Sequence, residues 1–272
     1  MRLSYDYPRR SAPTATASSK NPQNMRAVIF SAGLGSRLGT TSEKSPKILL
    51  SFNGRSLLER HLCQLKAVGI EEVILGIGFG ADKFKAELAR LDAPRVEFVY
   101  NPHYREGSIV TLWMLREALS RGGDVVLMDG DVLYDRRMLE RLMASPERNL
   151  FLLDRDVEAG EEPMKLAIKS DHPVDFRKTL ERDHDFYGES VGFFRVEENV
   201  ALELVDAAKR IIDEDRRGAY MEEAIRDVLL TSSPGRFGFE DITGLPWIEI
   251  DFAEDIIRAH KQILPRLIAE DR

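Results

Sequence analysis

Short apolar runs alternate with amphipathic segments along the first part of the chain. Strands are expected where Val, Ile, Leu and Phe cluster, over residues 26–32, 71–78, 95–101, 124–131 and 149–156. Between them, apolar residues recur at helical spacing over 55–70, 81–91, 108–121 and 136–144. This alternation predicts an α/β fold with a Rossmann-like, mostly parallel mixed sheet flanked by helices.

The rhythm changes beyond residue 155. Shorter strands are expected over 165–170, 176–183, 189–196, 236–241 and 246–251, and helices over 200–215, 220–230 and 254–268. We interpret 25–272 as one domain. Residues 25–155 form its nucleotide-binding half, and 156–272 form a small substrate lobe, the acceptor-binding half. Residues 1–24, rich in Ser, Thr, Ala and Pro, are predicted to be a disordered N-terminal extension.

Composition narrows the class of partner. The 272 residues carry 31% charged side chains and a net charge of -7, which is typical of a globular protein and argues against nucleic acid as the main partner. No apolar run approaches the roughly 20 residues of a membrane span, so no membrane partner is expected. Cys63 is the only cysteine. We therefore expect a cytoplasmic protein, and a homodimer is among the states that the sequence allows.

A glycine-rich loop, "SAGLGSRLG", follows the first expected strand. Gly33, Gly35 and Gly39 allow a close backbone approach to an anion. The spacing fits neither the dinucleotide-binding fingerprint, which needs a third glycine one position earlier, nor a P-loop, which needs Gly-Lys-Ser/Thr. What remains is a loop with a guanidinium at Arg37 and an ammonium at Lys47, both suited to phosphate. A tight turn with two solvated cations is the alternative at this point.

The stretch "AVIFSAGLGSRLG" and the later "SPKILLSFNGRSLLERHL" together resemble the N-terminal signature of nucleotidyltransferases that join an NTP to a phosphorylated small molecule. The matching positions are Gly33, Gly35, Arg37, Pro46, Lys47, Gly54 and Arg55. The resemblance implies a loop that wraps the triphosphate, formed by Ala32, Gly33, Leu34 and Gly35. It also implies that Arg37 and Lys47 are catalytic, stabilising charge at the reacting phosphates.

Carboxylates end two of the expected strands. Asp129 and Asp131 close strand 124–131, at the edge where open α/β sheets bind ligands, and oxygen ligands suit Mg²⁺. Glu249 and Asp251 share one face of a later strand. The resemblance implies metal binding by Asp131 and Asp251, with Asp129 beside the nucleotide. Helix caps or turns are the alternative for these aspartates.

The loops after two consecutive strands are where the resembled family builds its nucleobase pocket. Gly78, Gly107 and Ser108 are therefore expected to bind the nucleotide, through close backbone approach and hydrogen bonds. From the residues alone, two ordinary loops are the alternative.

The segments "NPHYREGSIVTLW" and "GLPWIEIDFAED" look most like the branch that uses CTP with phosphocholine, inositol-1-phosphate or aminoethylphosphonate. The elements typical of the sugar-1-phosphate branch are absent from the sequence. For the acceptor we expect Lys165 to hold a phosphate, and Glu189 and Glu222 to hold an ammonium or hydroxyl group. For Glu222, a solvated helix charge is the alternative.

The sequence thus predicts a Mg²⁺-dependent cytidylyltransferase. CTP and a small phosphorylated alcohol or phosphonate would give a CDP- or CMP-linked product and pyrophosphate. Two alternatives stay open. A sugar-1-phosphate or MobA-like nucleotidyltransferase would keep the chemistry and change the substrate, and a non-catalytic nucleotide-binding regulator would keep only the fold.

Overall fold

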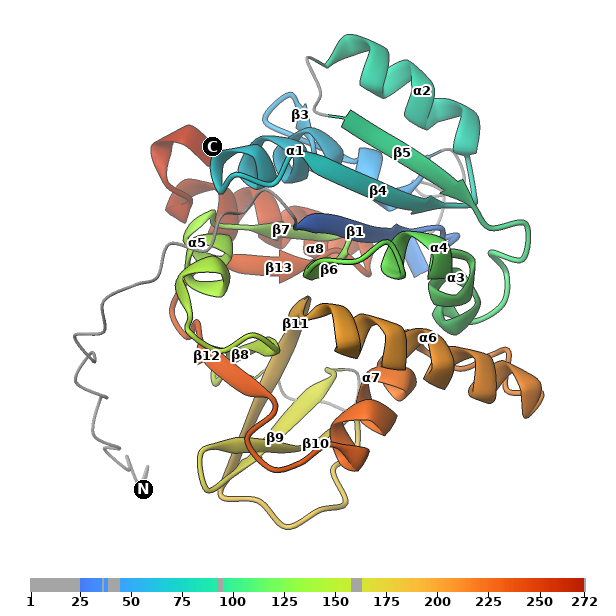
Figure 1. The fold of residues 1–272 in the computed structure, drawn as a ribbon. Helices are drawn as coiled ribbons and strands as arrows, with labels where there is room; N and C mark the ends of the chain where they lie inside the picture. The colour runs from blue at the N-terminus through green and yellow to red at the C-terminus, as the bar shows by residue number, and fades with distance from the viewer. Residues whose placement is uncertain (1–24, 36, 39–44, 92–94, 158–162, 272) are drawn as a thin grey trace.

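The computed structural model describes residues 25–35, 37–38, 45–91, 95–157 and 163–271 (Figure 1). The predicted extension over 1–24 and the glycine at position 39 lie outside these residues. Within the described ranges, no helix is both long enough and apolar enough to cross a bilayer.

A mixed sheet of nine strands runs through the described part of the chain. Seven strands follow the order β10-β9-β11-β6-β1-β4-β5, with β8 pairing with β11 and β12 pairing with β8. Their bounds are β1 Arg26–Ser31, β4 Glu72–Ile77, β5 Arg95–Tyr100, β6 Val125–Asp129, β8 Leu150–Asp154, β9 Lys165–Lys169, β10 His172–Arg177, β11 Phe186–Val196 and β12 Gly238–Asp241. The block β5-β4-β1-β6 is parallel, and β11 joins it antiparallel. The predicted fold class is therefore confirmed.

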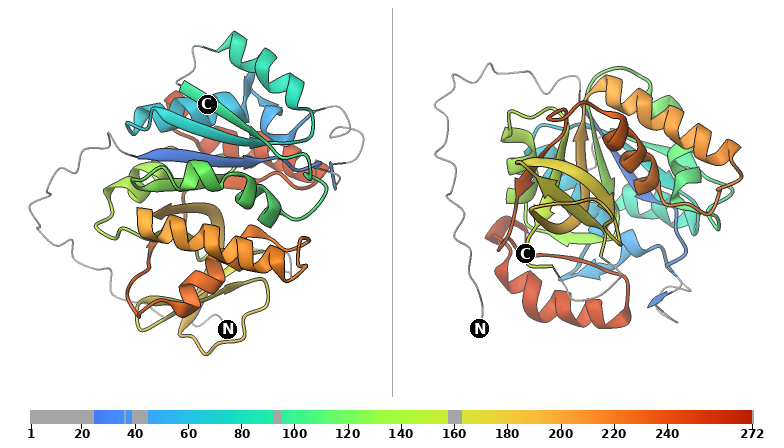
Figure 2. Two further views of the ribbon diagram at one scale, coloured as in Figure 1. Left: turned by 45° about the vertical axis from the view of Figure 1, so that its right-hand side comes forward. Right: turned by 90° about the horizontal axis from the view of Figure 1, so that it is seen from below.

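Helices cover both faces of this sheet (Figures 1 and 2). Along β1 the side chains alternate, so Ala27 and Ile29 enter one apolar cluster while Val28 and Phe30 enter the other. The first cluster is covered by α1 (Leu57–Ala67), α2 (Ala81–Arg90) and α5 (Arg137–Ala144). The second is covered by α3 (Ser108–Met114), α4 (Arg116–Leu119), α6 (Glu198–Asp213) and α7 (Met221–Thr231). Burial on both faces explains why the parallel strands are nearly continuous apolar runs.

Two small strand pairs complete the described fold. β2 (Ser51–Phe52) pairs with β3 (Arg55–Ser56), and β7 (Val132–Tyr134) pairs with β13 (Trp247–Glu249). The second pair matters for the site, because it ties the segment after β6 to the end of the chain. After β13 come α8 (Ala253–Arg258), a π-helical turn over Ala259–Ile263 and short 3-10 turns.

Three elements differ in detail from the sequence expectation. The strand expected over 176–183 lies at His172–Arg177, because Ser170 and Asp171 adopt positive φ and turn β9 directly into β10. The helix expected over 108–121 breaks at Leu115 into α3 and α4. The last expected helix is regular α-helix only to Arg258.

Candidate active site

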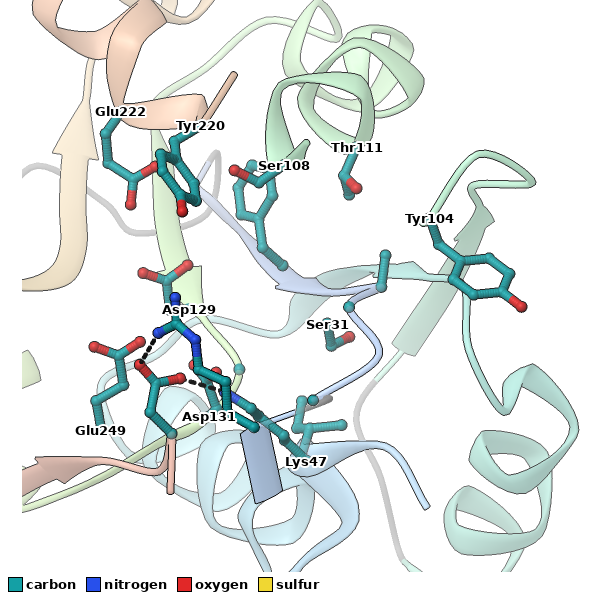
Figure 3. A pocket seen from close by; sticks show the side chains of 18 of the residues that line it. Ser31, Lys47, Tyr104, Ser108, Thr111, Asp129, Asp131, Tyr220, Glu222 and Glu249 are labelled. Carbon is teal, nitrogen blue, oxygen red and sulfur yellow. Dashed lines mark hydrogen bonds and ion pairs between the residues drawn. The ribbon is translucent and has the colours of Figure 1, made fainter. Parts of the chain in front are cut away.

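A cleft of about 360 Å³ opens at the carboxyl ends of β1 and β6 (Figure 3). Its size is within the range of small-molecule sites. The glycine loop, the end of β6, the segment after β13, the start of α3 and the start of α7 all contribute lining residues. The cleft thus joins the two halves that the sequence predicts, at the sheet edge where α/β proteins bind ligands.

The glycine loop forms the floor next to β1. Ala32, Gly33 and Gly35 line the cleft, whereas Leu34 does not. Gly35 has φ +61°, a conformation that glycine adopts at no steric cost. The Ala32 carbonyl accepts a hydrogen bond from the Phe79 N–H at 3.1 Å, so the loop is pinned to the segment after β4.

Three carboxylates converge on one side of the cleft, and we call Asp131, Glu249 and Asp251 the carboxylate cluster. One oxygen from each lies within 4.8 Å of the other two. The pairing of β13 with β7 brings them together, since Glu249 stands opposite Val132 and the Ile250 N–H donates to the Asp131 carbonyl at 2.9 Å. Residues 120 positions apart in the chain therefore share one site.

Two cations face this cluster. Lys47 Nζ lies 2.9 Å from Asp131 Oδ2 and 2.6 Å from Asp251 Oδ1, and Arg37 Nη1 lies 3.3 Å from Asp251 Oδ2. Lys47 opens a 3-10 turn whose next residue, Ile48, is buried in the core and fixes the turn. Burial opposes the charge on Lys47, but the charges of Asp131 and Asp251 outweigh it and raise its pKa.

The negative side chains repel one another. Desolvation, reinforced by the charges on Asp131 and Asp251, raises the pKa of Glu249 well above its usual range, although part of this side chain still faces the open cleft. Burial and the charges of Glu222 and Asp131 likewise raise the pKa of Asp129. Such a group of carboxylates becomes favourable when a cation joins it.

Residues behind the cluster hold its members in place. The Asp255 carboxylate accepts hydrogen bonds from the N–H groups of Asp251 and Phe252 at 3.0 and 2.7 Å. Asp255, rather than Asp251, thus fills the capping role at the start of α8. Next to the cluster, the carboxylate of Asp129 packs over Gly192, where an added methyl group would collide with it.

His61 supports the turn between Asp129 and Asp131 from below. It is fully buried, with Nε2 3.1 Å from the Gly130 carbonyl and Nδ1 3.4 Å from the Tyr134 hydroxyl. Because a carbonyl only accepts, Nε2 carries the proton and Nδ1 accepts from Tyr134. Burial lowers the pKa of His61 to about 4, so the ring is neutral at pH 7.

A second wall, the α3 wall, consists of Tyr104, Glu106, Ser108 and Thr111. Gly78 and Gly107 do not line the cleft. Gly78 lies against Tyr104, and Gly107 against the Ala219 carbonyl, with no room for a side chain at either position. These two predicted nucleotide-binding glycines thus lie behind the wall, and Ser108 lies in it.

The adjoining wall, which we call the α7 wall, consists of Met164, Lys178, Tyr220 and Glu222. Among the predicted acceptor residues, only Glu222 lines the cleft.

Lys165 and Glu189 stand opposite each other on β9 and β11. Lys165 Nζ donates to the Lys178 carbonyl at 2.9 Å, so it supports the segment that carries Lys178. Neither residue lines the cleft itself.

Sequence reasoning did not single out several lining residues. Ser31, Tyr104, Glu106, Met164 and Tyr220 are among them. Lys178 is another, and its place in the cleft follows from the β9–β10 hairpin. The only sequence signal for Glu249 as a third member of the cluster was its strand face, shared with Asp251.

Comparison with known proteins identifies the class of this fold and site. Residues 27–182 match the model of the MobA-like NTP transferase domain, and the chain belongs to this family of nucleotidyltransferases. The resemblance found in the sequence is therefore confirmed.

Individual relatives match most of the chain. The chain is 30% identical over 249 residues to the CMP-5'-(3-aminopropyl)phosphonate synthase of Streptomyces rubellomurinus, covering 89% of this chain and 39% of that protein. It is 20% identical over 253 residues to the CTP:phosphoglutamine cytidylyltransferase of Campylobacter jejuni, covering 85% and 98% of the two chains. The chain spans 39% to 52% of the length of the first three curated relatives that it matches.

Among solved structures, the CTP:phosphocholine cytidylyltransferase LicC of Streptococcus pneumoniae superposes with a TM-score of 0.70 at 20% identity. The match covers 87% of this chain and 98% of LicC. This likeness shows that the two chains share a fold.

Proposed function

We propose that this protein is a Mg²⁺-dependent cytidylyltransferase that joins CTP to a small acceptor bearing a phosphate or phosphonate. An acceptor oxygen attacks the α-phosphorus, the bond to the β-phosphate oxygen breaks, and pyrophosphate leaves with both bonding electrons. The observation that carries this proposal is the carboxylate cluster with Lys47 and Arg37 against it. The names of the relatives above support the choice of CTP.

The cluster suits a hard divalent cation. Three carboxylates offer only oxygen ligands, one from each within 4.8 Å of the others. Desolvation and the neighbouring charges of Asp131 and Asp251 raise the pKa of Glu249, an effect that a bound cation would offset. Asp131, Glu249 and Asp251 would hold Mg²⁺. When bound, the ion would neutralise charge on the nucleotide phosphates and orient them.

The remaining groups position the substrates and balance charge. Lys47 and Arg37 would stabilise the α-phosphate and the leaving pyrophosphate, because both reach the cluster from the loop side. The glycine loop would surround the triphosphate, and the α3 wall would face the base. An acceptor phosphate is already anionic at pH 7, so this chemistry depends on positioning rather than on a strong general base.

The class of substrate is tested by pyrophosphate release in Mg²⁺ with CTP, UTP, GTP and dTTP. Each nucleotide is paired with aminoethylphosphonate, phosphocholine, inositol-1-phosphate and glucose-1-phosphate. The proposal expects release that needs CTP and one of the first three acceptors. Release only with glucose-1-phosphate would move the protein to the sugar branch. Nucleotide binding without turnover of any pair of substrates would favour a non-catalytic nucleotide-binding regulator.

A further inference from the structure

Glu222 is a carboxylate of the cleft outside the carboxylate cluster. Its side chain points from the start of α7 into the space above Asp129 (Figure 3). The Oε2 atom is buried and has no hydrogen-bond partner among the described residues. A buried acceptor without a partner is costly, typically about 1–3 kcal/mol and more for a charged group. Its presence in a binding cleft indicates that a ligand supplies the partner.

The backbone fixes Glu222 in this place. The Met221 N–H donates to Ser108 Oγ at 2.8 Å, and the Ile109 N–H donates to the Ala219 carbonyl at 3.2 Å. These bonds lock the start of α7 onto the start of α3. The backbone that carries the Glu222 carboxylate is therefore fixed at the edge of the cleft.

The charges around Glu222 favour a cation as its partner. Burial raises the pKa of Glu222, and the charge of Asp131 adds to this effect. The Asp129 carboxylate faces the same part of the cleft. The backbone N–H of Glu222 and the charge of Lys178 oppose the shift only in part. An ammonium group placed here would satisfy the lone pair and offset the charge.

The aromatic ring of this wall is already engaged by a cation of the protein. Lys178 Nζ lies 5.4 Å from the centroid of the Tyr220 ring. A trimethylammonium group binds mainly through such rings and has no N–H to donate. The unpartnered Oε2 of Glu222, by contrast, requires a hydrogen-bond donor. The α7 wall thus suits an amine that keeps its N–H bonds.

We propose that Glu222 selects acceptors that carry a primary ammonium group, so that aminoalkyl phosphonates and aminoalkyl phosphates are substrates in preference to choline esters. This inference rests on the proposed cytidylyl transfer and goes beyond it, because it assigns the residue that chooses among acceptors. Glu222 binds substrate and takes no part in bond making.

The test compares three acceptors that differ only at nitrogen: aminoethylphosphonate, its N,N,N-trimethyl derivative, and ethylphosphonate. With CTP and Mg²⁺, we expect kcat/KM for the primary amine to exceed that of the other two by at least about 30-fold. In Glu222→Gln, KM for aminoethylphosphonate rises by a similar factor. The loss with ethylphosphonate is much smaller, because ethylphosphonate has no ammonium group for Glu222 to bind.

Glu223→Gln is the matched control. Glu223 is the next residue on the same helix turn, lies outside the cleft and is paired with Arg216. This variant is expected to keep wild-type acceptor kinetics. Equal use of all three acceptors by the wild type, or equal loss with all three in Glu222→Gln, would overturn the inference.

A binding measurement separates this inference from the proposed function. Calorimetric titration of aminoethylphosphonate is made into the full chain with Mg²⁺ and a non-hydrolysable CTP analogue, for wild type and Glu222→Gln. Binding that needs Glu222, without turnover of any acceptor, would overturn the proposed transfer and support the amine site. No preference for the amine in binding or turnover would overturn the amine site.

Discussion

The two sides of the cleft differ in how their charges are balanced. In the carboxylate cluster, Asp131 and Asp251 are bridged by Lys47, and Asp251 also meets Arg37. In the α7 wall, Glu222 has a buried oxygen with no partner among the described residues. The charged groups of the cluster would therefore meet the phosphates of any nucleotide substrate, whatever the acceptor. The buried oxygen of Glu222 in the α7 wall needs a hydrogen-bond donor, which only some acceptors carry.

This difference predicts two kinds of defect. Substitutions in or against the cluster should lower kcat or the response to Mg²⁺, whatever the acceptor. Substitutions in the α7 wall should change the KM of the acceptor alone. The comparison fails if both kinds of variant change the same kinetic constant.

The largest effect is expected for Asp131→Asn. It removes a carboxylate of the cluster and leaves Lys47 with one partner, so we expect kcat to fall at least about 10³-fold with every acceptor. The measurement is steady-state pyrophosphate release at saturating substrates. Asp82→Asn, on the exposed surface of α2, is the control and keeps wild-type kcat. A kcat of Asp131→Asn within tenfold of the wild-type value would contradict the assignment of Asp131 to the metal site.

Lys47→Met is expected to follow. It keeps most of the length of the side chain and removes the charge facing Asp131 and Asp251, so kcat falls about 10²- to 10³-fold while acceptor KM changes little. The measurement is the same assay, with Lys66→Met on the exposed side of α1 as control. A change confined to the KM of the acceptor would show that Lys47 acts in acceptor binding, like the α7 wall.

A smaller effect is expected for Glu249→Gln. The variant keeps two of three carboxylates, so the Mg²⁺ concentration for half-maximal rate should rise about 10- to 100-fold, with much of the rate recovered at high Mg²⁺. A Mg²⁺ titration of activity measures this. Glu254→Gln, exposed on α8, should titrate like wild type. An unchanged Mg²⁺ response in Glu249→Gln would limit the metal site to the two aspartates.

The smallest expected effect concerns the stability of the protein and His61, which lies under the turn between Asp129 and Asp131. His61 titrates near pH 4 in the folded protein and near 6.5 when unfolded. Between these values the unfolded chain binds more protons, so the free energy of unfolding falls as pH drops from 6.5 to 4, by up to about 3 kcal/mol. Urea unfolding at pH 7.0, 5.5 and 4.5 measures it. His61→Gln should lose less free energy of unfolding over this pH range than wild type. His260 is exposed, so His260→Gln should lose as much as wild type. Equal slopes in all three proteins would contradict the neutral, buried ring.

The sequence was sufficient for the parts of the site that local patterns encode. Arg37, Lys47 and Asp131 sit in or next to motifs at strand ends, and the parallel sheet brings such ends to one edge. Asp251 was expected at the same site from its place between a late strand and a helix. These predictions needed no knowledge of loop geometry.

Other parts depend on contacts that no local pattern reveals. Lys178 and Tyr220 meet because the β9–β10 hairpin folds next to the start of α7. Ser108 was expected to contact the base, and its hydroxyl also accepts from the first N–H of α7. Gly78 and Gly107 need to be glycine because Tyr104 and the Ala219 carbonyl pack against them, and only the fold determines these contacts.

The most direct test of the account is ³¹P NMR of the full chain incubated with Mg²⁺, CTP and aminoethylphosphonate, with Asp131→Asn in parallel. The account predicts pyrophosphate together with a pair of coupled phosphorus signals from CMP joined to the phosphonate, both absent in the variant. Appearance of CDP and inorganic phosphate instead would show cleavage at the wrong bond and would contradict the proposed transfer.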